Sequence, residues 1–242
     1  MKPDILKIDR YLIKDITKDF YKQEVFKSLV GLAHKIWALI VAEGIETEEE
    51  ALFVTELGVD MMQGFYFYMP QPAEDLKGGA VSSRVRDFPD QLKEALLRKI
   101  IAKRDHLMKY ELMTQKIQAE LSKIPSSGFD EKLLQMAGHS SSVECLYVLD
   151  EKGFQVSSTV FANAGIKTKN RLMFRPAEKG SDHAMKDYYY MMMNGGNKGT
   201  SFITEPYISL ATGNTCLTFS RFFEDSEKHQ RILCLDINTE FL

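Results

Sequence analysis

Apolar positions in the first 70 residues follow two different spacings. Short apolar runs at residues 5–9, 38–42 and 61–68 predict strands, whereas residues 21–37 and 47–57 carry apolar side chains at helical spacing. Thr47 and Glu50 have the spacing of a helix capping box, and Gly58 is a typical residue just after a helix. Strands that alternate with helices in this way predict parallel βαβ units.

A different pattern follows a segment punctuated by prolines and glycines at residues 70–79. Residues 89–124 have helical periodicity, with no proline or glycine after Pro89. One helical face carries Leu97, Ile101, Met108 and Leu112. Arg104 and Glu111 interrupt this face, so two interpretations stay open: an amphipathic helix packed on a neighbour, or a signalling helix that forms a dimer.

The last third of the chain is rich in β-type runs. Residues 144–159 predict two strands joined at 150–153, and further strands are expected at 200–209, 215–223 and 231–238, with a helix at 184–193. Strands that cluster together, with helices at one end, predict an antiparallel α+β domain. We therefore expect three parts: an α/β part at 1–77, a linker and helix at 78–125, and an α+β domain at 126–242.

Composition narrows the class of protein. The chain of 242 residues has a net charge of −3, which predicts no general affinity for nucleic acid or anionic membranes. The longest apolar run, residues 36–42, is too short to span a bilayer, and charged residues near the N-terminus exclude a signal peptide. Cys145, Cys216 and Cys234 have no CxxC spacing, which predicts buried free thiols and a cytoplasmic location.

Polar residues stand at the ends of the three N-terminal strands. Lys7 and Asp9 close the first strand, Glu43 and Glu46 follow the second, and Gln63 lies in the third. The carboxyl ends of parallel strands meet at one rim, where carboxylates can hold a divalent metal and an ammonium can face phosphate. Two simpler interpretations remain, namely an acidic helix N-terminus after Glu46 and a solvated strand end at Asp9.

The motifs "KPDILKIDRYLIKDI" and "VAEGIETEEEALFVTELGVDMMQGFYFYMPQP" resemble the C-terminal part of the EAL domain, over about residues 2–76. That family hydrolyses the bacterial second messenger cyclic di-GMP to pGpG on a TIM-type barrel, with Mg²⁺ or Mn²⁺. The resemblance implies that Lys7 lies by the scissile phosphate and that Glu43 belongs to the metal site. It also implies that Glu46 supports the adjoining loop and that Gln63, with Asp9, lies near the substrate.

The chain departs from the family by lacking the earlier barrel strands, which supply the Glu-Ala-Leu stretch and most metal ligands. Three strands make only a partial TIM-type barrel and cannot hold two metal ions. We therefore predict that this chain does not hydrolyse cyclic di-GMP and binds no metal tightly. Two explanations are open: the chain is the end of a longer, active phosphodiesterase, or it is a natural remnant that serves as a dimerising scaffold.

The stretches "FRPAEKGSDHAMKDYYYMMMNG", "TEPYISLATGNTCLTFSRFF" and "ILCLDI" resemble the Cache/PDC sensor family. These PAS-like domains place a five-stranded antiparallel sheet against helices and hold a small ligand between the sheet and loops. The resemblance implies a ligand site at Arg171 or Arg175, Tyr188, Tyr207 and Asp236. The competing interpretation makes the tyrosines packing residues and Asp236 a turn residue.

Together these patterns predict a cytoplasmic signalling protein. A sensor domain that binds an unknown small molecule would act through the 89–124 helix on the dimerisation or the loops of the EAL part. The expected partners are cyclic di-GMP, the sensed small molecule and a second copy of the chain in a homodimer, without nucleic acid or a membrane span.

Overall fold

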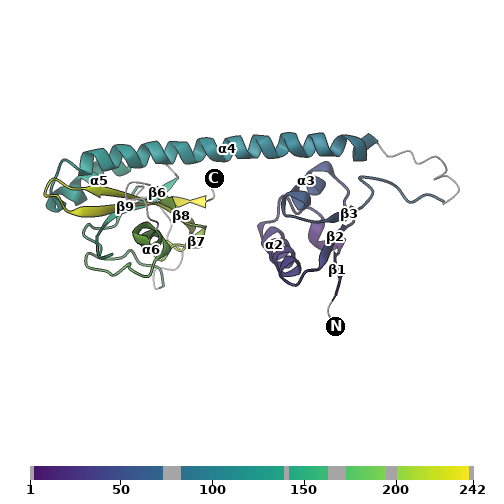
Figure 1. Cartoon of the computed structure of the whole chain (residues 1–242), viewed down its shortest axis with the longest axis horizontal. Coiled ribbons are helices and arrows are strands. Elements are labelled where there is room, and N and C mark those ends of the chain that lie inside the picture. The colour runs from purple at the N-terminus through teal and green to yellow at the C-terminus, as the bar shows by residue number, and fades with distance from the viewer. Residues whose placement is uncertain (1–2, 73–82, 139–141, 163–172, 195–200, 240–242) are drawn as a thin grey trace. The chain divides into compact units, whose positions relative to one another are not determined.

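The computed structural model describes residues 3–72, 83–138, 142–162, 173–194 and 201–239. The chain divides into two compact units, Met1–Ala102 and Lys103–Leu242 (Figure 1). Each unit has its own sheet and its own hydrophobic core. The predicted boundary at residues 77 and 78 lies outside the described residues, and the predicted boundary near residue 125 remains a prediction.

Unit 1 contains the expected strand–helix alternation. Its elements are β1 (Ile5–Ile8), α1 (Arg10–Ile13), α2 (Phe20–Lys35), β2 (Leu39–Glu43), α3 (Glu48–Glu56) and β3 (Met61–Gln63). The three strands pair in parallel in the order β1-β2-β3, with Lys7 opposite Val41 and Glu43 opposite Gln63. The sequence therefore predicted the parallel βαβ arrangement of this unit.

The core of unit 1 lies between the sheet and its helices. Ile8 and Ile40 from the sheet pack with Phe26 and Val30 of α2 and with Val54 of α3. The capping box is present as predicted: the Thr47 hydroxyl accepts from the Glu50 amide, and the Glu50 carboxylate accepts from the Thr47 amide. This cap fixes where β2 ends and α3 begins.

One local prediction in unit 1 was wrong, and one short element was missed. The third strand ends at Gln63 instead of continuing to Tyr68, because the chain turns where the Ile45 carbonyl accepts a hydrogen bond from the Tyr66 amide. Gly64 makes this turn possible, since a Cβ there would lie 2.0 Å from the Ile45 carbonyl oxygen. The short helix α1 was not foreseen, although Asp9 is an ordinary N-cap for it.

The long helix α4 (Ser83–Leu121) begins earlier than the sequence predicts and contains Pro89. Contacts in its first turns anchor this extension: Arg84 donates to the Tyr66 carbonyl at 2.9 Å, and the ring of Phe88 meets that of Phe67 edge-on at 5.7 Å. Buried aromatic packing thus holds a helical start that the proline alone would disfavour.

Unit 2 is built on an antiparallel sheet of six strands. Five of them form the path β5-β4-β9-β8-β6, and β7 also pairs with β8. The remaining elements are helices that adjoin the sheet and its connections. In chain order the elements after α4 are η1 (Ser126–Gly128), α5 (Phe129–Ala137), β4 (Val143–Asp150), β5 (Val160–Phe161), α6 (Asp187–Asn194), β6 (Ser201–Ile203), β7 (Tyr207–Ile208), β8 (Thr215–Glu224) and β9 (Gln230–Asn238).

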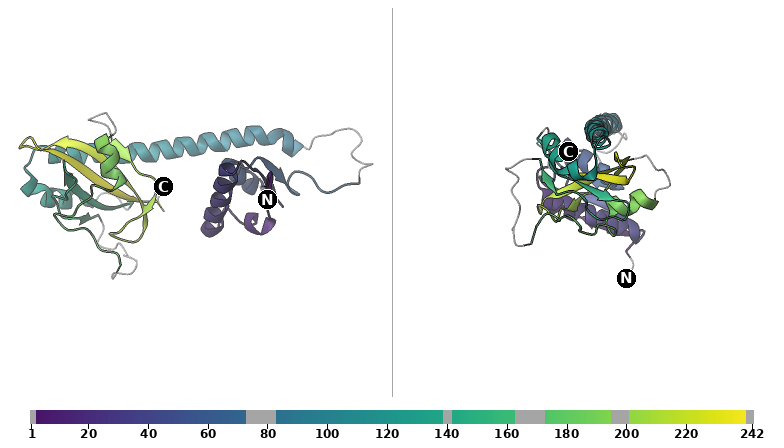
Figure 2. Two further views of the ribbon diagram at one scale, coloured as in Figure 1. Left: turned by 60° about the horizontal axis from the view of Figure 1, so that its bottom comes forward. Right: turned by 90° about the vertical axis from the view of Figure 1, so that its left-hand side faces the viewer.

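The two faces of this sheet have different surroundings. Alternate residues such as Leu146 and Leu235 share a core with Tyr110 of α4 and Phe129 of α5. The opposite face carries Cys145, Tyr147, Cys234 and Asp236, which lie on the side of α6. Figure 2 shows α6 in green against the long β8–β9 pair in yellow.

The β-type runs of unit 2 differ in detail from the prediction. The turn at 150–153 forms, but its return arm is an isolated bridge between Leu149 and Gln155, because the Ser157 hydroxyl instead of a backbone carbonyl accepts from the Val148 amide. The expected strand 200–209 splits into β6 and β7 at Thr204–Pro206. Helix α5 was not predicted.

All three cysteines are free and buried, as predicted. In the part of the chain that the structure describes, no helix is both long and apolar enough to cross a membrane.

Candidate functional site

Lys7 and Glu43 lie together at the carboxyl rim of the three-stranded sheet. Their side chains form a hydrogen-bonded ion pair between neighbouring parallel strands. Lys7 is largely exposed and Glu43 is about one-third exposed, so the pair faces solvent. Exposed pairs add little to stability, which leaves both groups available for a phosphate or a cation.

The neighbouring loop is held by a second ion pair. The Arg10 guanidinium lies 2.7 Å from the Glu46 carboxylate, and the Arg10 side chain crosses directly over Gly44. Gly44 has a φ of +77°, and a Cβ at this position would lie 2.6 Å from the Cβ of Arg10. Glu46 therefore fixes the loop beside Glu43 through Arg10, and Arg10 was not among the residues predicted from the sequence.

Gln63 and Asp9 occupy the same rim. The Gln63 carbonyl accepts from the amides of Gly44 and Ile45 at 2.7 and 3.1 Å, while its side chain is exposed. The Asp9 carboxylate accepts from the Tyr11 amide at 2.8 Å and caps α1. Asp9 thus has a structural task at the strand end, and its place as a substrate contact remains a prediction.

The divalent ion implied by the resemblance does not fit this rim alone. Within the described ranges, no three carboxylate or histidine side chains gather there closely enough to ligate one ion. Glu43 is also already paired with Lys7. Hard cations take six or more oxygen ligands, so these residues account for only a small part of such a site.

Unit 2 contains a cavity of about 400 Å³, in the range of small-molecule sites. It lies on the sheet face that carries Tyr147 and Asp236, and Tyr188 and Tyr207 contribute aromatic walls. Tyr188 and Tyr207 approach each other with ring centroids 6.4 Å apart. They are therefore both packing residues and cavity walls, so the two interpretations of the sequence are compatible.

Asp236 is the buried charge of this cavity. It lies in β9, between Cys145 of β4 and Thr218 of β8, so its assignment to a turn was wrong. Its carboxylate accepts from the Thr218 hydroxyl at 2.8 Å, from the Cys145 thiol at 3.3 Å and from the Tyr147 hydroxyl at 3.4 Å. Burial raises the pKa of the Asp236 carboxyl to about 6, although these hydrogen bonds lower it in part.

The arginines predicted for this site have different outcomes. Arg175 lines the cavity but is exposed, and Arg171 lies outside the described residues. Sequence reasoning missed Gln155 and His183, two buried side chains that also line the cavity. Gly153 and Gly180 precede these residues by two and three positions and have positive φ, but glycines of this kind indicate turns and do not mark a binding residue.

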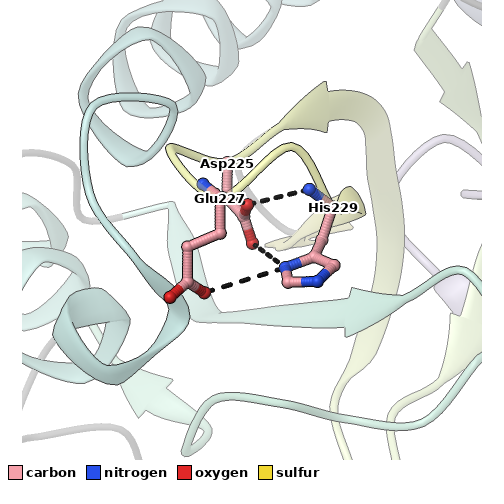
Figure 3. A group of neighbouring side chains, drawn as sticks. All are labelled: Asp225, Glu227 and His229. Atoms are coloured by element: carbon pink, nitrogen blue, oxygen red, sulfur yellow. Dashed lines mark hydrogen bonds and ion pairs between the residues drawn. The ribbon is translucent and has the colours of Figure 1, made fainter.

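A second acidic group lies at the β8–β9 turn, where Asp225, Glu227 and His229 approach one another (Figure 3). One Asp225 oxygen accepts from the backbone amides of Glu227 and His229 at 2.9 and 3.0 Å. The other binds Arg231 Nε at 2.8 Å. Both oxygens are occupied in closing the hairpin, so this group is explained by the turn.

Comparison with known proteins supports these observations. The model of the EAL domain matches residues 1–70. A probable cyclic di-GMP phosphodiesterase of Escherichia coli, PdeN, is 40% identical over 72 residues, which are 30% of this chain and 14% of PdeN. The MucR protein of Pseudomonas aeruginosa, a bifunctional diguanylate cyclase and cyclic di-GMP phosphodiesterase, is 41% identical over 71 residues, 29% of this chain and 10% of MucR.

One similar protein extends over the whole chain. YkuI of Bacillus subtilis, an uncharacterized protein with an EAL domain, is 24% identical over 246 aligned residues, 100% of this chain and 58% of YkuI. Its crystal structure, in complex with substrate c-di-GMP and calcium, has a TM-score of 0.70 with 22% identity, covering 98% of this chain and 57% of that chain. Residues 1–70 are thus similar to the EAL domain of cyclic di-GMP phosphodiesterases, and the fold of the chain is similar to that of YkuI.

Proposed function

We propose that this chain is part of a cyclic di-GMP signalling protein, with EAL-type residues in unit 1 and a small-molecule sensor in unit 2. The observation that carries the proposal is the Lys7–Glu43 pair at the carboxyl rim of parallel strands, inside the segment that matches the EAL domain. An ammonium at such a rim suits a phosphodiester, as the family resemblance implies for Lys7.

Catalysis by this chain alone is not part of the proposal. Hydrolysis of a phosphodiester by divalent ions needs a complete ligand set, and the described rim offers Glu43 with few companions. The chain spans 58% of YkuI and 14% of PdeN. The activity of a longer protein that contains the strands of unit 1 is therefore a separate question. The alternatives of an active full-length phosphodiesterase and of a dimerising scaffold therefore stay open to experiment.

Two observations support a sensor in unit 2. Its antiparallel sheet has six strands where five were expected, and with helices against it the sheet is compatible with a PAS-like or Cache-like arrangement. Its cavity is of ligand size and is lined by aromatic residues around one buried carboxylate. Such cavities with a few convergent polar groups are the usual form of small-molecule sites. The three buried free thiols suit a reducing cytoplasm.

Signal transfer is assigned to α4, which belongs in part to each unit. Apolar side chains on it, including Ile100, Met108 and Leu112, are more than half exposed within one chain. A second copy of α4 would cover them, and light scattering after size exclusion tests this homodimer directly. A monomer at micromolar concentration would remove dimerisation from the proposal.

The test of the EAL part measures binding and hydrolysis separately. Purified protein is incubated with cyclic di-GMP and Mn²⁺, and we expect cyclic di-GMP to bind without release of pGpG. Lys7→Met removes the ammonium and should weaken binding several-fold. Lys35→Met should not, because Lys35 is an exposed lysine at the end of α2, where the chain enters the amino end of β2. Release of pGpG by pure protein would refute the inactivity, and equal binding by both variants would refute the role of Lys7.

A further inference from the structure

Gln155 has a buried oxygen without a partner in the unit 2 cavity. Its side-chain nitrogen faces three acceptors, the Ser157 carbonyl at 2.9 Å, the Thr159 hydroxyl at 3.0 Å and the Ala177 carbonyl at 3.3 Å. Three acceptors around one end of the amide fix its orientation, because only the NH₂ group can donate to them. The other end, Oε1, has no hydrogen-bond partner among the described residues.

His183 has the same property on a neighbouring segment. Its Nδ1 lies 2.7 Å from the Tyr188 hydroxyl, while Nε2 is buried and has no partner in the described ranges. The backbone bridge between Phe154 and Asp182 places Gln155 and His183 on the same face of two antiparallel segments. Both side chains are more than nine-tenths buried, and both line the cavity.

The role of Nε2 depends on the hydrogen bond between His183 and Tyr188. Nδ1 and the Tyr188 hydroxyl lie 2.7 Å apart, and either group can be the donor. When Nδ1 carries the proton of the neutral imidazole, it donates to the Tyr188 oxygen, and Nε2 is an acceptor. A ligand N–H group placed at Nε2 selects this form of the ring.

The cavity therefore presents acceptors and negative charge. Gln155 Oε1 is an acceptor without a donor, His183 Nε2 becomes a second one when Nδ1 carries the proton, and the buried Asp236 carboxylate has no cationic side chain paired with it among the described residues. Unpaired buried acceptors are costly, so a ligand that supplies N–H donors regains that free energy. Stacked and tilted rings of Tyr147, His183 and Tyr188 add faces that favour a cation.

We propose that the unit 2 cavity binds a small organic cation that carries N–H donors, an alkylammonium or guanidinium compound, with Gln155 Oε1 and His183 Nε2 as its polar contacts. The proposal rests on the sensor part of the proposed function and names the ligand class for that cavity. The exposed Arg175 and Lys186 line it as well, and neither is needed for recognition of the cationic group.

The first experiment compares matched probes on the full chain. Putrescine and agmatine supply charged N–H donors, 1,4-butanediol has a similar length without charge, and succinate has the opposite charge. Calorimetric titration and thermal unfolding should show binding and a raised Tm for the two amines only. Binding of succinate alone would overturn the ligand class while leaving a sensor in place.

The second experiment tests the two named contacts. His183→Asn keeps a donor near the position of Nδ1 and removes Nε2, and it should weaken putrescine binding about tenfold or more, the value of one hydrogen bond to a charged group. Gln155→Met, with folding checked by circular dichroism, should have a similar effect. Met185→Ala is the control, because Met185 lines the cavity but is almost fully exposed. Unchanged binding in both test variants would refute the proposed contacts.

A third measurement uses the unsubstituted protein, so it does not depend on whether the variants fold. Long-range ¹H–¹⁵N spectra of the histidine rings report which nitrogen carries the proton, and we expect His183 to be protonated at Nδ1 in the putrescine complex. Putrescine should shift the Nε2 signal. Protonation of Nε2 in the putrescine complex would refute the acceptor role, and failure of every probe to bind would refute the sensor as well. The cyclic di-GMP assays on unit 1 are independent of both results.

Discussion

The Asp236 carboxylate accepts a 2.8 Å hydrogen bond from the hydroxyl of Thr218, its cross-strand neighbour on β8. The Cys145 thiol and the Tyr147 hydroxyl complete the donors, and all three are uncharged. A buried carboxylate without a cation is stabilised incompletely, which is why burial raises its pKa to about 6. The buried Glu144 adds to this rise through charge repulsion.

This raised pKa predicts a pH dependence of stability with a definite sign. The folded protein holds the Asp236 proton up to a pH of about 6, whereas the unfolded chain loses it near 3.8. The contribution of the Asp236 proton to the free energy of unfolding is thus fully present below pH 3.8 and is lost as pH rises through 6. It amounts to at most about 3 kcal/mol at 1.36 kcal/mol per pKa unit.

Asp236→Asn tests that sign, because the variant cannot titrate. Its free energy of unfolding should rise relative to wild type between pH 4 and pH 7, measured by urea unfolding across the series. The difference between the two proteins is the informative quantity, since burial also lowers the pKa of His183, which acts with the opposite sign below pH 6.5. A difference that is constant with pH would contradict the raised pKa.

The start of α3 makes a second prediction. Glu50 accepts from the amides of Asp15, Glu46 and Thr47, whereas the Thr47 hydroxyl accepts only from the Glu50 amide. Thr47→Ala should therefore cost about 1 kcal/mol of unfolding free energy, and Glu50→Ala clearly more. Urea unfolding measures both.

The control for this pair is Glu49→Ala, since Glu49 lies in the same first turn but is exposed. Its removal should change stability by less than about 0.5 kcal/mol. Equal losses in Glu49→Ala and Glu50→Ala would mean that general charge at the helix N-terminus, and not the capping box, stabilises this end.

The third prediction concerns two glycines at which the same substitution by alanine should change stability in opposite directions. Gly64→Ala should destabilise unit 1 by several kcal/mol, because the new methyl group would meet the Ile45 carbonyl at 2.0 Å. Gly31→Ala lies within α2 and meets nothing within 4 Å, so it should stabilise by about 0.5–1 kcal/mol. Thermal unfolding of the two variants checks both signs, and a neutral Gly64→Ala would show that the rim loop can move away.

Sequence patterns identified the features of this fold that depend on local spacing. The parallel strands, the capping box at Thr47 and the burial of the cysteines all follow from residue type and periodicity. The end of β3 could not be predicted in this way, because it depends on the Ile45 carbonyl, which lies near in space but 18 positions before Gln63 in the chain.

The residues of the candidate cavity also fall into those that the sequence indicated and those that it did not. Tyr188, Tyr207 and Asp236 were predicted from a resemblance and do line it. Gln155 and His183 were missed, because they come from segments that are distant in sequence. The backbone bridge between Phe154 and Asp182 brings these segments together. Nothing in local spacing marks a glutamine whose oxygen lacks a donor. Such residues become visible only when hydrogen bonds are counted in three dimensions.

Glu111 breaks the apolar pattern of α4 in the sequence and forms a polar contact with the sheet in the structure. It interrupts the apolar face of α4, and in the structure its carboxylate pairs with Arg221 of β8 and accepts from the Ser201 hydroxyl at 2.8 Å. Arg221 also donates to Gln118 at 2.7 Å. Glu111 therefore links α4 to strands β6 and β8 of the sheet through these charge-assisted hydrogen bonds.

A double-mutant cycle on Glu111 and Arg221 is the fourth prediction. Arg221 is largely buried and Glu111 is about one-third exposed, so the two single variants Glu111→Gln and Arg221→Met should each cost about 1–3 kcal/mol of unfolding free energy. The double variant should lose less than the sum by about 0.5–2 kcal/mol, since either change alone leaves a charge without its partner. Lys228→Met is the control, because Lys228 pairs with Glu224 at the exposed end of β8 and should change stability little. Additive losses in the cycle would mean that Arg221 holds α4 through Gln118 alone.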